Sequence, residues 1–235
     1  MVLADPLRRA LDLARQFGSR GVAVFDLDST LLDNKPRQAR ILREFGAAEK
    51  VAALANMTPT HWSSWDLKDA MRNAGVAADV VERLAPQAKE FWRQKFFTSE
   101  YCALDDAIPG AVDFVRQVAE SGVVVAYCTG RHEPMREGSI ASFKRLGFPV
   151  PGVATHLLMK PQIETSDDDW KETAYDQLRR LGYVFAIFDN EPTHVNGYRN
   201  AFPDALVVHL DTDHSGRDVN VLPGILSVKD FSSPS

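Results

Sequence analysis

Residues 22–32 read Val-Ala-Val-Phe-Asp-Leu-Asp-Ser-Thr-Leu-Leu, a short apolar run that two acidic residues follow at once. Val22–Phe25 has the composition of a strand buried in a parallel sheet. Asp26 and Asp28 come at its carboxyl end, and residues i and i+2 of an extended segment point the same way. Their carboxylates repel each other unless a cation joins them or one takes up a proton. A solvated acidic turn is the alternative, which the flanking apolar residues disfavour.

Four more apolar runs later in the chain also have the composition of buried parallel strands. Helical patterns separate them: Pro109 and Gly110 begin one helix, and Ser166 with Asp169 forms a candidate capping box for another. Strands and helices in alternation predict an α/β fold, with a parallel sheet covered on both faces. The four runs are Val123–Tyr127, Val153–Leu158, Val184–Phe188 and Ala205–Leu210.

The stretch between the first and second strands contains no convincing strand. Its apolar residues recur at helical spacing in two stripes, which predict helices. We interpret residues 35–105 as an inserted all-helical domain, and residues 1–34 and 106–235 as the α/β core that carries it. The stripes are Ile41, Leu42, Phe45 and Ala48, then Val80, Val81, Leu84, Ala88, Phe91 and Trp92.

Composition excludes several classes of protein. The chain has 235 residues, of which 45% are hydrophobic, enough for one large domain or for a domain with a sizeable insertion. A net charge of −5 argues against a general nucleic-acid or membrane-surface binder. Cys102 and Cys128 are too few for a disulfide framework. The sequence shows neither a secretory signal nor an apolar run long enough to span a membrane, so we expect a cytoplasmic protein.

Polar residues follow other predicted strands as well. Thr129, in Cys-Thr-Gly-Arg, follows the second strand, and Asp189, in Asp-Asn-Glu-Pro, follows the fourth. Ligands of open parallel sheets bind outside the carboxyl ends of the strands. Any one of these residues alone could be a turn residue or a helix N-cap. Mg²⁺ prefers oxygen ligands, and Asp26, Asp189 and a backbone carbonyl near Asp28 could supply them.

The segment Asp26–Leu32 resembles the first motif of the haloacid dehalogenase-like superfamily. Thr129 resembles the second motif, a downstream lysine the third and Asp189 the metal-binding fourth, so the resemblance spans roughly residues 20 to 210. The helical insert resembles the cap domain of many members. The resemblance implies a Rossmann-like sheet with strands in the order 5-4-1-2-3, which brings Asp26 and Asp189 together at the switch point.

The resemblance also implies a role for each matching residue. Asp26 would attack phosphorus to form an aspartyl-phosphate. Asp28 would protonate the leaving oxygen and then accept a proton from water, a transfer worth roughly 10²–10⁴-fold in rate. Thr129, with Gly130 and Arg131, would bind the phosphoryl group. Mg²⁺, held at Asp26, Asp28 and Asp189, would offset negative charge between Asp26 and the phosphate.

Two lysines compete for the third motif. Lys171 shares a predicted helical face with Ala174 and Leu178, where a buried ammonium needs an anion such as Asp26. Lys160 stands in a predicted loop, and we prefer Lys171. In the fourth motif, Asn190 and Thr193 stand where many members have a second acid, directly after Asp189 or a few residues on. Asn190 can orient a metal-bound water and Glu191 can serve as an outer ligand, but their roles stay open.

Asp28 separates the branches of the superfamily. Dehalogenase members lack an acid two residues after the nucleophile, so its presence favours a phosphatase. We expect a Mg²⁺-dependent phosphomonoester hydrolase acting on a small phosphorylated metabolite. The alternatives are a mutase-like phosphotransferase, a polynucleotide 3′-phosphatase-like enzyme and a non-catalytic binding module. The sequence names neither the substrate nor the oligomeric state.

Three weaker signals remain, and the first two have two readings each. Arg131 either contacts substrate or is a solvated loop arginine. Trp62 and Trp65 either line a specificity pocket or form the core of the insert. Residues 211–218 form a polar loop that we expect to be solvated.

Overall fold

β1 (Gly21–Phe25) is buried at every residue and lies at the centre of a parallel sheet. The structure is a computed structural model that describes residues 4–232 of the chain. β1 pairs with β4 (Val124–His132) on one side and β6 (Tyr183–Asp189) on the other. The six strands run in the order β5-β4-β1-β6-β7-β8, with β5 at Thr155–Lys160, β7 at Leu206–Leu210 and β8 at Leu226–Val228.

The five segments predicted as strands occupy five neighbouring positions of this sheet. β8 lies outside the prediction, because Leu226-Ser-Val228 is short and mostly exposed at the sheet edge. β4 continues to His132, so Thr129–Arg131 lie within the strand and not after it as predicted. Lys160 is the buried last residue of β5, so its placement in a loop was wrong.

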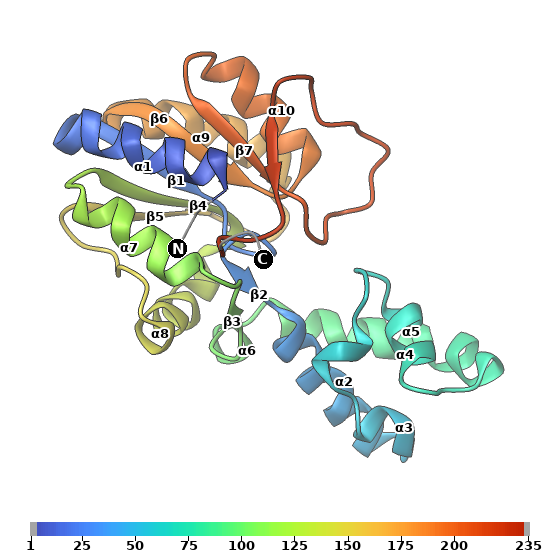
Figure 1. Ribbon diagram of the computed structural model, residues 1–235. Coiled ribbons are helices and arrows are strands. Elements are labelled where there is room, and N and C mark those ends of the chain that lie inside the picture. Colours follow the sequence, from blue (N-terminus) through green and yellow to red (C-terminus); the bar gives the residue numbers. More distant parts are fainter. Residues whose placement is uncertain (1–3, 233–235) are drawn as a thin grey trace.

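Helices cover both faces of the sheet (Figure 1). Ala23 and Phe25 of β1 point into a core with α1, α7 and α8, while Val22 and Val24 point into a second core with α9 and α10. This alternation is the period of two expected of an extended strand. The covering helices are α1 (Asp5–Phe17), α7 (Ala111–Glu120), α8 (Arg136–Leu146), α9 (Asp167–Leu181) and α10 (Pro192–Ala201).

Residues 35–102, between β1 and α7, form a group of helices that projects from one end of the sheet (Figure 1). We call this group the helical insert. It has its own apolar core, built around Leu42, Phe45, Val81 and Leu84. Its helices are α2 (Lys35–Ala48), α3 (Ala52–Ala55), α4 (Leu67–Asn73), α5 (Ala78–Phe96) and α6 (Ser99–Cys102).

A two-stranded antiparallel ladder joins the insert to the sheet. β2 (Leu32–Asp33) leads into the insert and β3 (Asp106–Ala107) leads out of it. Leu32 pairs with Ala107 and Asp33 with Asp106. Sequence patterns did not predict this ladder, because a strand of two residues carries no detectable alternation.

Short 3₁₀ turns connect several of these elements, at Gly18–Arg20, Pro59–His61 and Glu133–Met135. Cys102 and Cys128 are both buried and free. Of the helices within residues 4–232, none combines the length and the apolar character needed to cross a membrane.

Candidate active site

The first acidic pair lies in a tight turn at the carboxyl end of β1. The Asp26 backbone N–H still donates to the Phe188 carbonyl of β6, at 2.9 Å, so Asp26 extends the sheet. Beyond it, the Leu27 carbonyl accepts from the backbone N–H groups of residues 30, 31 and 32. Ser29 takes the left-handed conformation, with φ of 59°, to close this turn. Asp26 thereby lies at the carboxyl end of β1, where its side chain pairs with Lys171.

Lys171 joins the ends of three strands. It comes from α9 and is only 1% exposed. Its Nζ donates to Asp26 Oδ1 at 2.7 Å, to Asp189 Oδ2 at 2.9 Å and to the Cys128 carbonyl at 2.6 Å. All three ammonium protons therefore have acceptors. Lys160 instead pairs with Asp167 at 2.7 Å. Of the two lysines, Lys171 lies beside Asp26 and Asp189.

The two carboxylates that share Lys171 differ in their pKa values. Burial raises the pKa of Asp26 to about 7, against the lowering effect of Lys171 and with a further rise from Asp189. Burial would also raise the pKa of Asp189, but Lys171 and His194 hold it well below its ordinary value. The pKa of Lys171 lies well above its ordinary value, because both carboxylates outweigh its desolvation. One negative charge at this site is therefore firmly held and the other is more readily neutralised.

Asp28 is held by two arginines. Arg131 Nε donates to Asp28 Oδ2 at 2.7 Å, while Arg131 Nη2 and Arg37 Nη2 reach Oδ1 at 2.8 and 2.7 Å. Both arginines also pair with the buried Asp105, at 2.5 and 2.9 Å. Although burial opposes ionisation, the two guanidinium groups lower the pKa of Asp28 well below its ordinary value. Both Asp28 carboxylate oxygens are thus engaged by guanidinium groups.

The environment of Arg131 rules out one of the two interpretations of this residue in the sequence. It is 3% exposed, so its reading as a solvated loop residue was wrong. Its neighbour Gly130 lies so close to Asp167 that an added Cβ would stand 2.7 Å from Oδ2. The Thr129 hydroxyl accepts from the Arg131 backbone N–H at 3.2 Å, and its carbonyl accepts from Trp170 Nε1 at 2.9 Å. This segment is fixed by contacts on both sides.

Asn190 and Glu191 hold the chain that follows β7. The amide of Asn190 accepts from Thr30 Oγ1 at 3.2 Å and donates to the Asp213 carbonyl at 2.6 Å. Glu191 accepts from the backbone N–H and the hydroxyl of Ser215, both at 2.9 Å. The polar loop after β7 was expected to be solvated, but these contacts tie its middle to the edge of the sheet.

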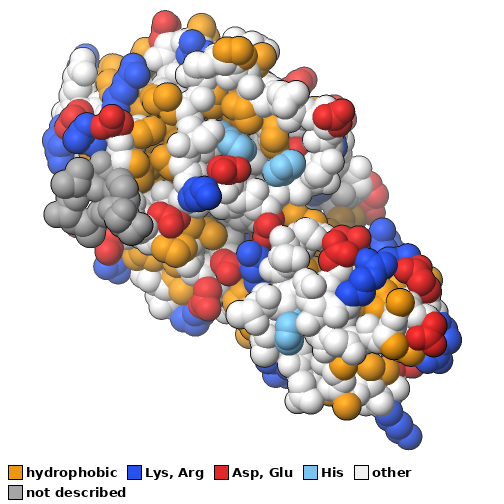
Figure 2. Space-filling model, turned by 45° about the vertical axis from the view of Figure 1, so that its right-hand side comes forward, with side chains coloured by type: hydrophobic (Ala, Val, Ile, Leu, Met, Phe, Trp, Pro, Cys, Tyr) orange, Lys and Arg blue, Asp and Glu red, His pale blue; other side chains and the backbone are white. Residues whose placement is uncertain are grey.

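A pocket of about 340 Å³ lies between the sheet edge and the helical insert. Figure 2 shows one face where the α/β part and the smaller helical insert meet, with acidic, basic and histidine side chains gathered on the α/β part. The sheet contributes charged and polar groups to the pocket, and α5 of the insert contributes aromatic ones. The principal lining residues are Asp26, Asp28, Thr129, Gly130, Arg131, Asn190, Glu191, His194, Trp65, Trp92, Phe96 and Phe97.

The sequence profile of the haloacid dehalogenase-like hydrolases matches residues 21–155, more than half of the chain. The chain belongs to this hydrolase family. The matched range includes Asp26, Asp28 and Thr129, and it ends before Lys171 and Asp189. No curated protein matches the chain.

Solved structures show the same fold at low sequence identity. Protein Tyrosine Kinase A of Mycobacterium tuberculosis is 18% identical, with a TM-score of 0.57 over 90% of this chain and 94% of that one. A haloacid dehalogenase-like protein of Streptococcus pneumoniae is 13% identical, with a TM-score of 0.52 over 90% and 94%. CbbY of Rhodobacter sphaeroides, solved with phosphate, is 14% identical, with a TM-score of 0.51 over 91% and 95%.

The chemistry of the donor atoms in this hydrolase suits a hard cation. Asp26 and Asp189 are brought together by one ammonium group, and the backbone carbonyl of Asp28 comes from the adjacent turn. Carboxylate and carbonyl oxygens are the ligands that Mg²⁺ takes, with waters completing its shell. Within residues 4–232, no three or more His, Cys, Asp or Glu side chains are grouped as a metal site would require. Two carboxylates and a backbone carbonyl are thus the oxygen donors that this site could offer to Mg²⁺.

Three residues of this hydrolase site were not predicted from the sequence. Arg37 and Asp105 bracket the insert and meet only because the insert folds back onto the sheet. His194 Nδ1 lies 3.5 Å from Asp189 Oδ1, and its Nε2 lies 3.0 Å from Asp168. In the sequence, Arg37 is a charged residue next to a predicted apolar stripe, which is a weak signal for a functional residue. The histidine stands five residues after Asp189 on α10, which was the only local signal for it.

Proposed function

We propose that this hydrolase is a Mg²⁺-dependent phosphomonoester hydrolase that works through an aspartyl-phosphate on Asp26. The observation that carries the proposal is the contact of Lys171 with both Asp26 and Asp189 at the base of the pocket. A buried ammonium group beside a carboxylate fixes the orientation of that carboxylate and offsets its negative charge. The carboxylate can then approach a phosphate as a nucleophile with less repulsion. We assign Thr129, Gly130 and Arg131 to the phosphoryl-binding side of this site.

The first step transfers the phosphoryl group to Asp26. An Asp26 carboxylate oxygen forms a bond to phosphorus while the bond from phosphorus to the leaving oxygen breaks. Lys171 keeps the other oxygen in place, and the Thr129 hydroxyl donates to a phosphoryl oxygen. Mg²⁺, when held by Asp26, Asp189 and the Asp28 carbonyl, supplies positive charge that reduces repulsion between Asp26 and the phosphate. In the second step water attacks phosphorus, releasing inorganic phosphate and restoring the Asp26 carboxylate.

Asp28 is the proposed proton carrier for both steps. It gives a proton to the leaving oxygen and later accepts one from the attacking water. Its pairing with Arg37 and Arg131 opposes protonation, so proton donation by Asp28 weakens as the pH rises.

The helical insert is the proposed cap. We assign residues 35–105 to the cap, and residues 1–34 and 106–235 to the catalytic core. The aromatic side chains that α5 adds to the pocket support this assignment, because they cover the nucleophile with apolar surface. Such a cover excludes water that would compete with the substrate.

Release of inorganic phosphate from p-nitrophenyl phosphate tests the proposal. We expect turnover with Mg²⁺, its loss with a chelator and its loss in Asp26→Asn, while circular dichroism shows an intact fold. Transfer of phosphate to an added sugar phosphate in place of water would identify a phosphotransferase. Halide release from a 2-haloacid would identify a dehalogenase. Undiminished turnover by Asp26→Asn would refute the assignment of the nucleophile.

A further inference from the structure

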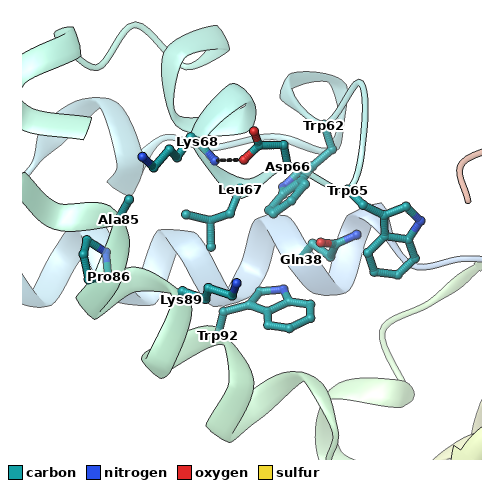
Figure 3. A pocket seen from close by; sticks show the side chains of 10 residues that line it. All are labelled: Gln38, Trp62, Trp65, Asp66, Leu67, Lys68, Ala85, Pro86, Lys89 and Trp92. Carbon is teal, nitrogen blue, oxygen red and sulfur yellow. Dashed lines mark hydrogen bonds between the residues drawn. The ribbon is translucent and has the colours of Figure 1, made fainter. Parts of the chain in front are cut away.

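The helical insert contains a second and larger pocket. Its volume is about 620 Å³, within the range of sites for small molecules. Three tryptophans and the stems of two lysines surround it (Figure 3). We call it the tryptophan pocket. Its lining residues are Gln38, Trp62, Trp65, Asp66, Leu67, Lys68, Ala85, Pro86, Lys89 and Trp92.

The tryptophan pocket and the catalytic pocket share a wall. Trp65 and Trp92 line both. Trp92 stacks on Phe96, with ring centroids 4.3 Å apart, and Trp65 meets the same ring edge-on at 5.8 Å. The Arg37 guanidinium covers the Phe96 ring at 3.8 Å and also binds Asp28. A continuous aromatic surface therefore leads from the tryptophan pocket to the catalytic pocket.

Polar atoms of the tryptophan pocket lack partners. Nε1 of Trp62, Nε1 of Trp92 and Oε1 of Gln38 form no hydrogen bond within residues 4–232. Neighbouring side chains cover these atoms, so a ligand would reach them after a rotation of a side chain. Buried donors and acceptors without partners destabilise a fold, which favours a ligand that supplies them.

The charged side chains at the rim of the tryptophan pocket also favour a ligand. Lys68 pairs with Glu82, whereas Lys89 forms no ion pair with another described residue. In Figure 3 the Lys89 side chain lies along the rim beside Trp92. Flat aromatic walls, an ammonium group and hydrogen-bonding atoms together suit a planar ring with polar edges.

We propose that the tryptophan pocket binds a planar aromatic group on the leaving side of the substrate, while the phosphate lies at Asp26. This inference rests on the proposed phosphomonoester hydrolysis and names its substrate class: a phosphomonoester whose alcohol carries an aromatic ring on a short linker. A nucleobase and an apolar aryl group share this chemistry. Trp65 and Trp92 line both pockets, so a ring held against them lies next to the catalytic pocket.

Substrates with matched leaving groups provide the test. Adenosine 5′-monophosphate, 2-naphthylmethyl phosphate and ribose 5-phosphate all release a primary alcohol, and only the last lacks an aromatic ring. We expect a KM for the first or second that is about 10-fold lower than that for ribose 5-phosphate, as one stacked ring would give. Preference for adenosine monophosphate alone identifies a nucleobase, and preference for the naphthyl compound alone identifies an aryl group. Equal KM values for all three would overturn the inference.

Matched variants locate the effect. Trp65→Leu and Trp92→Leu should each reduce the preference for the ring-bearing substrate, by about 10-fold and mainly through KM. Phe91→Leu is the control, because Phe91 neighbours Trp92 on α5, packs against Phe45 and lines neither pocket. It should leave the preference unchanged. An equal loss in Phe91→Leu would indicate a packing effect and overturn the assignment.

A binding measurement separates this inference from the proposed function. Adenosine and 2-naphthylmethanol, which carry no phosphate, should quench the tryptophan fluorescence of Asp26→Asn, and Trp92→Leu should weaken the quenching. Quenching without any phosphatase activity would support the pocket and refute the hydrolase proposal. Phosphatase activity with neither ring preference nor quenching would refute the pocket alone.

Discussion

The edge of the sheet and the tryptophan pocket differ in whether their buried polar groups have partners. At the sheet edge, Lys171 has three acceptors and Asp28 has two guanidinium partners. In the tryptophan pocket, two indole N–H groups and the Gln38 amide oxygen have no hydrogen-bond partner among residues 4–232. Fully paired charges keep a fixed geometry, as catalysis needs, while unpaired groups leave room for a ligand to add contacts. The contrast predicts that substitutions at the two sites differ in size and kind.

Removal of the central cation should have the largest effect. Lys171→Met leaves Asp26 and Asp189 buried without their shared partner, which should lower the free energy of unfolding by about 3–5 kcal/mol. Phosphate release should fall by about 10²–10³-fold, since a preorganised charge is lost. Urea unfolding and the phosphate-release assay measure the two effects. Lys160→Met is the control, and a greater loss of activity there would mean that the wrong lysine has been assigned.

Arg37 links the two regions, because it belongs to the insert and binds Asp28 and Asp105. Arg37→Met should lower the free energy of unfolding by about 3 kcal/mol, by leaving Asp105 with one arginine. Arg37→Met combined with Asp105→Asn should be less destabilised than the sum of the single variants. A double-mutant cycle by urea unfolding measures this coupling. Strict additivity would show that the pair contributes nothing to the contact between insert and sheet.

The raised pKa of Asp26, about 7, should make Mg²⁺ binding depend on pH. Mg²⁺ requires the carboxylate, so its apparent affinity should fall about 10-fold for each pH unit below 7. Without the ion, this group contributes stability that is complete below pH 4 and lost as the pH rises through 7. Isothermal titration at pH 6 and pH 8 measures the affinity. The same pH dependence in Asp26→Asn would assign the proton to another group.

A polar group of the tryptophan pocket should give the smallest effect. Gln38→Met conserves volume and removes an amide oxygen that has no partner, although it also removes the hydrogen bond of the amide N–H to Asn34. We expect a change in the free energy of unfolding within about 1 kcal/mol. A loss as large as that of Arg37→Met would show that Gln38 is as firmly paired as the sheet-edge charges, and would remove the contrast between the two sites.

The sequence was informative where function depends on local periodicity. The i, i+2 spacing located Asp26 and Asp28 at a strand end, and a shared helical face directed Lys171 toward the sheet. Arg37 and Asp105 escaped notice because their meeting depends on how the insert packs, and no local pattern encodes that. The continuation of β4 through Arg131 depends on pairing with β5, which is a property of the sheet and not of the segment.

The ladder of β2 and β3 has a consequence for folding. Val22 of β1 pairs with Val124 of β4, so the central sheet must close a loop that contains the whole insert. The entropy lost in closing a flexible loop grows with the length of that loop. Once the insert has formed its own core and the ladder has paired, Leu32 lies beside Ala107, and only residues 26–31 and 108–123, the latter with α7, separate the two strands from that pair. Pathways in which the helices form first therefore replace a long loop closure by a short one.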